Sequence, residues 1–139
     1  MRLTMSVGIL LAVFLIVPVT VAAQGSDVET RKAVQYGTHD GATLVGDLYL
    51  PEDGKIHPAI VAVHGGGYQL GSRDLYRYMG PHLAANGYAV FSIDYRLIHD
   101  EKNRYPAAVN DTRAAVQWVR SHAAELKIDP VRIALMGLP

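Results

Sequence analysis

Short apolar runs and amphipathic stretches alternate along the chain after residue 24. Residues 30–36 and 43–50 have strand-like patterns, and the Asp40-Gly41 pair between them is a turn signal, so together they predict a β-hairpin. Residues 59–63 form a continuous apolar run rather than an alternating one. Such a run indicates a strand that is buried on both faces of its sheet.

The remainder of the chain alternates between helical and strand patterns. Residues 75–86 predict a helix, residues 88–93 an apolar strand, and residues 107–123 a longer helix. The Asp129-Pro130 pair is expected to turn the chain into a final apolar strand at residues 131–136. Strands that alternate with helices imply right-handed crossovers, so we predict an α/β fold with a largely parallel sheet between helices.

The helix at residues 107–123 shows which of its sides should be buried. Apolar residues recur at helical spacing at Val109, Val116, Val119 and Ala123, and we expect them to face the core. Trp118 is interpreted as a core residue rather than a cofactor contact. The opposite side carries Arg113, Gln117 and Arg120, which suit a solvent-exposed face.

The first 23 residues differ from the rest of the chain. Arg2 is their only charged residue, an apolar run covers residues 7–19, and small residues precede Gln24. This layout predicts a secretory signal peptide at 1–23, cleaved after Ala23, and places the mature chain, 24–139, in the periplasm or outside the cell. The alternative is an uncleaved membrane anchor, since residues 5–23 approach the roughly 20 residues that span a bilayer. Pro18 and the small residues favour cleavage.

Composition narrows the classes of function. The 139 residues carry 13 basic and 13 acidic side chains and suit one globular domain, and no basic run offers a surface for nucleic acid. The chain has no cysteine, which excludes disulfides, a thiol nucleophile and cysteine-bound metal. The six histidines form no His-x-His or His-Glu-x-x-His pair, so we expect no metal and no cofactor.

The most informative segment is His64-Gly65-Gly66-Gly67-Tyr68, directly after the predicted strand 59–63. Three consecutive glycines allow backbone conformations that a Cβ would forbid, and they let N–H groups approach a ligand closely. Several donors can then point at one spot, such as the oxygen of an ester carbonyl that becomes negatively charged during acyl transfer.

Two phosphate-binding motifs do not fit this segment. A dinucleotide fingerprint starting at Gly65 would need a glycine at Leu70, and a P-loop starting at Gly66 would need lysine at Ser72. The remaining alternative is a flexible glycine turn without function. The flanking histidine and tyrosine, together with the strand that precedes the glycines, favour a functional loop.

A strand followed by His-Gly-Gly-Gly and an aromatic residue resembles the oxyanion motif of α/β-hydrolase esterases and lipases. Residues 92–97, residues 105–119 and residues 128–134 resemble the segments that follow it in the hormone-sensitive-lipase-like and acetyl-xylan/feruloyl-esterase-like branches. The likeness extends from about residue 30 to Gly137. It implies an N-terminal portion of the α/β-hydrolase fold in residues 24–139, a partial domain without the C-terminal strands.

The resemblance assigns roles within the loop. Gly66 and Gly67 would be the oxyanion donors, helped by Gly65, and His64 would mainly shape the loop. Tyr68 would line the substrate pocket, with a packing aromatic at the base of the loop as the alternative. Four other polar residues are interpreted as structural, because polar groups at strand and helix ends usually satisfy backbone groups or pair locally. They are Asp94, Tyr95, Arg96 and Asp111.

The resemblance also predicts a Gly-x-Ser-x-Gly nucleophile elbow after the strand at 131–136. The chain reads Gly137-Leu138-Pro139, so proline stands where serine is expected. In this fold the acid and the histidine follow the serine, and both would lie beyond the end of the chain. We therefore expect the chain alone to be inactive, and the strand at 131–136 to form an exposed sheet edge.

The resulting hypothesis is that the parent protein is an exported serine carboxylic-ester hydrolase. It would act through an acyl-enzyme on a small-molecule or carbohydrate-linked ester. Two alternatives remain: a non-catalytic remnant or binding module, and a fragment of a prolyl-oligopeptidase-type serine peptidase.

Overall fold

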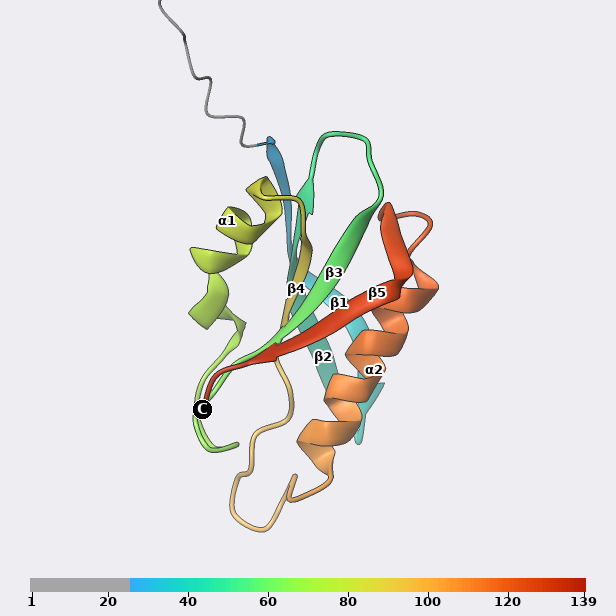
Figure 1. Ribbon diagram of the computed structural model, residues 1–139. Helices are drawn as coiled ribbons and strands as arrows, with labels where there is room; N and C mark the ends of the chain where they lie inside the picture. The colour runs from blue at the N-terminus through green and yellow to red at the C-terminus, as the bar shows by residue number, and fades with distance from the viewer. Residues whose placement is uncertain (1–25) are drawn as a thin grey trace, which may run out of the picture.

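A computed structural model describes residues 26–139, which form one mixed sheet with helices on both of its faces (Figure 1). The strands are β1 (Val28–His39), β2 (Ala42–Pro51), β3 (His57–Val63), β4 (Ala89–Ile93) and β5 (Ile128–Gly137). The helices are the 3₁₀ helix η1 (Arg73–Tyr76), α1 (Met79–Ala85) and α2 (Ala107–Ser121). The strand order is β1-β2-β4-β3-β5, with β1, β2 and β4 antiparallel to one another in turn and β3 parallel to both β4 and β5. The predicted hairpin and the α/β class are confirmed.

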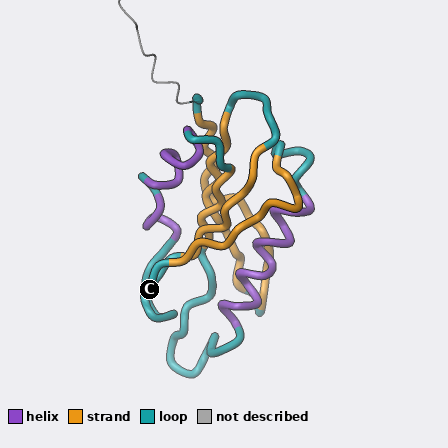
Figure 2. The backbone as a smooth tube through the Cα atoms, viewed as in Figure 1, coloured by secondary structure: helices purple, strands orange, loops and turns teal. Residues whose placement is uncertain are grey.

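The core has one layer on each side of the sheet, because successive strand residues point to opposite faces. On the side of α2, Phe91 and Ile93 of β4 pack with Ala115 and Val119 of the helix. On the side of α1, Val90 packs with Tyr76, Ala84 and other buried residues. Every residue of β4 is buried. Figure 2 shows the two helical layers flanking the strands, with the loops that follow β3 and β4 at the same end as the C-terminus.

The helix predicted at 75–86 is divided in two. The 3₁₀ helix η1 ends at Tyr76, and α1 begins only at Met79. Pro81 explains the break, since it has no N–H to donate to the carbonyl of Arg77 and its ring would clash with that carbonyl in a continuous helix. In the first turn of α1 the missing N–H costs nothing, because the first N–H groups of a helix have no partner within it.

Strand β5 begins before the predicted turn. Asp129 and Pro130 lie inside the strand rather than ahead of it. The pairing with β3 is irregular there, since Ile128 pairs with His57 but the next paired residue, Ile133, pairs with Ala59. A proline is tolerated there because the ladder is interrupted. Within residues 26–139, β5 pairs only with β3 and is an edge strand, as predicted. The exposed fraction of Val131 is 86%.

The predicted core face of α2 is confirmed at Val119 and Ala123, with Val116 packed partly buried against the core, but not at Val109. The fully covered positions of α2 follow an i, i+4 stripe of Ala107, Asp111, Ala115 and Val119, whereas Val109 is 41% exposed. The assignment of Val109 to the core was wrong. Helical spacing defines a face but not its rotation about the axis, and packing against the sheet selected the face that carries small residues and Asp111.

The predicted signal peptide at residues 1–23 lies outside the residues that the structure describes. Among residues 26–139, no helix has the length and apolar character needed to cross a membrane.

Candidate functional site

The glycine loop leaves the carboxyl end of β3 and requires glycine at several positions. Gly66, Gly67 and Gly71 have φ angles of 118°, 61° and 101°, in the left-handed region that side chains disfavour. A Cβ on Gly66 would lie 2.3 Å from the carbonyl oxygen of Leu70, and one on Gly71 would lie 2.4 Å from Nδ1 of His64. The loop therefore folds back on itself more closely than any other residue would allow.

His64 supports the base of the loop. Its side chain is buried, and its Nδ1–H donates to the carbonyl oxygen of Gly65 at 2.9 Å. The ring stacks on Tyr95 with centroids 4.3 Å apart, and the Tyr95 hydroxyl donates to the carbonyl oxygen of His64 at 2.9 Å. Burial raises the pKa of Tyr95, which keeps this donor protonated. These contacts fasten the His64 side chain and backbone at the base of the loop.

The segment that leaves the loop is held by a buried ionic network. The Arg73 N–H and guanidinium bond to Asp94, and its Nε donates to Asp47 at 2.9 Å. Asp47 is 1% exposed and also accepts from Lys32 and from the N–H of Ala33. Burial would raise the pKa of Asp47, but these donors outweigh it and hold the pKa below its ordinary value. The carboxylate therefore stays ionised and joins the hairpin to η1.

The loop leaves backbone donors available. Its Gln69 and Leu70 N–H groups both donate to the carbonyl oxygen of Gly66 at 3.1 Å. The N–H groups of Gly66 and Gly67 have no acceptor among residues 26–139. Two neighbouring amides without an internal partner are available to donate to a ligand oxygen.

A cleft of about 310 Å³ lies beside the loop. It is lined by Val63, His64, Gly65, Gly67, Tyr68, Tyr95, Gly137, Leu138 and Pro139. The backbone after β5 approaches the loop closely, since a Cβ on Gly65 would lie 2.2 Å from the carbonyl oxygen of Pro139. The structure thus brings together all the site residues expected from sequence except Gly66, which lies in the same loop but does not line this cleft.

Tyr68 stands at the opening of this cleft and of a second one. Its side chain is 57% exposed, and its ring meets the edge of Tyr95 with centroids 6.3 Å apart. It lines the cleft and also contacts a neighbouring aromatic residue. Both interpretations of Tyr68 therefore describe part of its environment.

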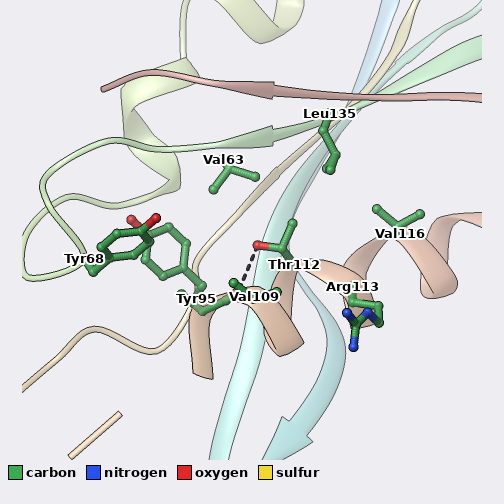
Figure 3. Close-up of a pocket in the computed structure, with 9 residues that line it drawn as sticks. Val63, Tyr68, Tyr95, Val109, Thr112, Arg113, Val116 and Leu135 are labelled. Atoms are coloured by element: carbon green, nitrogen blue, oxygen red, sulfur yellow. Dashed lines mark hydrogen bonds between the residues drawn. The ribbon is translucent and has the colours of Figure 1, made fainter. Parts of the chain in front are cut away.

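The second cleft has a volume of about 510 Å³ and lies between α2 and strands β3 and β5. Figure 3 shows Tyr68 and Tyr95 side by side at one end, with Val109 and Thr112 on α2 and with Val63 and Leu135 on the strands. Sequence reasoning missed the residues of α2. The exposure of Val109 has no signature in the sequence, because an apolar residue at helical spacing is normally assigned to the core.

Two of the polar residues interpreted as structural, Arg96 and Asp111, form a second network next to α2. Asp111 is fully buried and accepts from the Arg96 N–H at 2.9 Å, from the Arg96 guanidinium and from Nδ1 of His39 at 2.7 Å. Burial would raise the pKa of Asp111, but Arg96 and His39 hold it below its ordinary value. The network joins the hairpin turn to α2 and to the segment after β4, so the structural interpretation of Arg96 and Asp111 is confirmed.

Within the described part of the chain, neither a metal site nor a serine placed in a cleft is found. Residues 26–139 contain no group of three or more His, Cys, Asp or Glu side chains placed to hold a metal. The serine hydroxyls there all bond to nearby backbone groups, and none of these serines lines either cleft. They are Ser26, Ser72, Ser92 and Ser121.

Comparison with known proteins gives consistent results. The BD-FAE family model matches residues 46–139. Carboxylesterase NlhH of Mycobacterium tuberculosis is 43% identical over 81 residues, which cover 58% of this chain and 25% of the relative. Ethyl acetate hydrolase of Pseudomonas putida is 31% identical over 121 residues, which cover 84% of this chain and 37% of that protein.

Solved structures agree with these relatives. A thermophilic esterase from Thermogutta terrifontis matches with a TM-score of 0.69 and 33% identity, over 81% of this chain and 40% of that one. A bacterial heroin esterase matches with a TM-score of 0.66 and 29% identity, over 86% of this chain and 37% of that one. The chain therefore spans only between 25% and 40% of the length of these four proteins.

Proposed function

The chain belongs to the BD-FAE family and forms the N-terminal portion of an α/β-hydrolase esterase, and from this premise we propose that its parent protein is a serine carboxylic-ester hydrolase. The observation that carries the proposal is the pair of Gly66 and Gly67 N–H groups, which have no acceptor within residues 26–139. They lie in the loop at the carboxyl end of β3, the position from which this fold supplies its oxyanion donors.

In this proposal the ester carbonyl lies between the glycine loop and the backbone that follows β5. Its oxygen accepts from the N–H groups of Gly66 and Gly67, and Gly65 allows the close approach of the two segments. As a nucleophile attacks the carbonyl carbon, negative charge develops on that oxygen. Each preorganised donor then stabilises the transition state by about 3–4 kcal/mol.

In the mechanism of this fold the nucleophile is a serine on an elbow after β5, and Gly137 corresponds to the first glycine of that elbow. The serine oxygen attacks the carbonyl carbon while a histidine takes its proton, and the ester's alcohol leaves with that proton to give an acyl-enzyme. Water then attacks the acyl-enzyme with the histidine as base, the acid is released and the serine regains its proton, while an acidic residue orients the histidine throughout. Pro139 stands at the serine position of that elbow and has no nucleophilic oxygen. We therefore propose that these 139 residues alone do not hydrolyse esters.

The substrate is proposed to be a small-molecule or carbohydrate-linked ester. The relatives support an ester over a peptide, because they are named as a carboxylesterase, an ethyl acetate hydrolase and a heroin esterase. The leader-like segment at residues 1–23 supports export to the periplasm or the medium.

A chimaera tests the function. Residues 26–138 are joined to the C-terminal portion of the Pseudomonas putida ethyl acetate hydrolase, which supplies the serine, acid and histidine, and hydrolysis of p-nitrophenyl acetate is measured. We expect turnover, and we expect Gly66→Ala to lower kcat/KM about 100-fold or more, since its Cβ would displace the loop donors. Gly41→Ala is the matched control, because Gly41 also has a positive φ but lies in the hairpin turn.

A folded chimaera without esterase activity would contradict the proposed function. Equal activity in the Gly66→Ala and Gly41→Ala variants would contradict the assignment of the oxyanion donors. Turnover of p-nitrophenyl esters by the pure 139-residue chain would contradict its proposed inactivity.

A further inference from the structure

A third cavity adjoins Tyr68 on the side away from β5. Its volume is about 170 Å³. It is lined mainly by Tyr68, Ile98, Asn103, Tyr105, Pro106 and Val109. The lining is almost entirely apolar or aromatic, and neither cleft described above includes the residues 98–106 that form its outer wall.

Tyr68 separates this cavity from its neighbours. Among residues 26–139, it is the one residue that lines all three spaces: the 310 Å³ cleft beside the glycine loop, the 510 Å³ cleft along α2 and the 170 Å³ cavity. Val109, exposed rather than in the core, lines both the cavity and the cleft along α2. The Tyr68 ring therefore borders the cleft beside the glycine loop as well as both apolar spaces.

The backbone of Tyr68 is strained. Its φ of 64° is in the left-handed region, which is rare for a bulky residue and would suit a fourth glycine better. The conformation is held by the Ile98 N–H, which donates to the carbonyl oxygen of Tyr68 at 2.8 Å. Strain at a substrate cleft is often retained for the position of a side chain. Here it holds an exposed aromatic ring between two apolar spaces.

Hydrogen bonds and an ion pair outside the cavity stabilise the segments that form its walls. Asn103 Nδ2 donates to the carbonyl oxygen of Leu97 at 2.9 Å, which ties the loop after β4 to itself. The Arg96–Asp111 network joins the start of that loop to α2. The cavity is therefore preformed, so an occupant does not have to order its walls.

We propose that the 170 Å³ cavity binds a compact apolar group of the ester, no larger than about one benzene ring, and that Tyr68 is the specificity-determining wall that excludes larger groups. This inference rests on the proposed ester-hydrolase function. The size limit follows from the volume, since an apolar cavity of about 150 Å³ accommodates benzene. The rings of Tyr68 and Tyr105 offer aromatic contacts to such a group.

Binding to the 139-residue chain tests the pocket without any need for turnover. Ligand-observed ¹⁹F NMR compares methyl 4-fluorobenzoate, which has one ring, with methyl 6-fluoro-2-naphthoate, which has two. We expect the wild type to bind the one-ring ester about tenfold more tightly, the range that a size-limited apolar pocket provides. Tyr68→Gly, which suits the positive φ, should abolish that preference by joining the cavity to the larger cleft.

A second variant and a control complete the design. Val109→Phe fills the cavity from an exposed helix position and should weaken binding of the one-ring ester about tenfold while leaving the two-ring ester unchanged. Tyr88→Ala removes another exposed tyrosine that lines none of the three spaces, and should change neither affinity.

The inference is overturned if the wild type shows no preference, or if Tyr68→Gly and Val109→Phe both retain it. Selective binding together with an inactive chimaera would keep the pocket and remove the proposed ester hydrolysis. An active chimaera, together with ester binding to the 139-residue chain that neither Tyr68→Gly nor Val109→Phe changes, would keep the proposed ester hydrolysis and remove the pocket.

Discussion

Single side chains hold the glycine loop in place. The Tyr95 hydroxyl donates to the carbonyl oxygen of His64, while the two rings stack on one another. This contact joins the segment after β4 to the first residue of the loop, although the two residues are 31 positions apart in the sequence. The glycines permit several loop conformations, and this contact between remote residues stabilises the one that is observed.

Tyr95→Phe isolates the hydrogen bond from the stacking. We expect a loss of about 1–2 kcal/mol in the free energy of unfolding, because the buried carbonyl of His64 loses its donor while the ring remains. Urea unfolding followed by circular dichroism measures the loss. Tyr105→Phe is the control, since that side chain is 87% exposed and should change the stability little. Equal stabilities of the two variants would show that the hydroxyl does not hold the loop.

Asp53, in the loop between β2 and β3, makes a pH-dependent contribution to the free energy of unfolding. The Lys55 N–H and then His57 lower the pKa of Asp53 from 3.8 to about 2. The ionised form is therefore favoured in the folded chain, and its stabilisation is complete above the unfolded value and lost as the pH falls from 3.8 towards 2. Asp53→Asn should flatten the dependence of the unfolding free energy on pH in that window. Glu52→Gln is the control, because it removes a neighbouring carboxylate. If Asp53→Asn left the slope of the unfolding free energy against pH unchanged from the wild type, the assignment to Asp53 would be contradicted.

At the scale of elements, the glycine loop and α1 depend on backbone restrictions. Pro81 delays the start of α1 and leaves room for η1, which places Arg73 and Tyr76 against the sheet. The Tyr76 hydroxyl donates to the carbonyl oxygen of Val63, the last residue before the loop. The separation of η1 and α1 thus lets both ends of the loop be fastened.

Strand β5 is the element from which we expect self-association. It is an edge strand in residues 26–139, and its exposed apolar residues can pair with another copy of the chain. We expect Val131→Lys to lower self-association, because a charge on an edge strand opposes pairing. Sedimentation velocity at several concentrations measures the effect. Ile56→Lys is the matched control, since Ile56 is 66% exposed but lies outside the strands. A monodisperse, cooperatively melting wild-type chain would contradict the prediction.

At the scale of the whole molecule, two ionic networks join parts of the chain that the sheet alone does not bring together. Asp47 links Lys32 of β1 and Arg73 of η1, and Asp111 links the hairpin turn to the segment after β4. Both carboxylates are buried and both have lowered pKa values. The first network holds the segment that follows the glycine loop, and the second holds the segment that follows β4.

Asp47→Ala tests the first network. We expect a loss of about 2–3 kcal/mol in the free energy of unfolding, because Arg73, Lys32 and the Ala33 N–H would lose a buried, charged acceptor. Denaturant unfolding measures this loss, and Asp74→Ala in η1 provides an exposed carboxylate for comparison. A loss below about 1 kcal/mol would show that the network is no stronger than a surface ion pair.

Much of the architecture was predictable from the sequence because its signals are local. Alternating apolar positions and the Asp40-Gly41 turn indicate the hairpin, and the run at residues 59–63 indicates a buried strand. The three glycines mark the loop, because their backbone freedom is a property of those residues alone. The likeness to esterases depended on the same short segments in their correct order.

Other features depend on contacts between residues far apart in the chain, and only the folded molecule decides them. Packing against the sheet turned Val109 out of the core and into a cavity wall. The hydrogen bonds from Tyr95 and Ile98 set the shape of the loop, and that shape leaves the N–H groups of Gly66 and Gly67 available. Sequence periodicity describes one element at a time, whereas these clefts form where three or four elements meet.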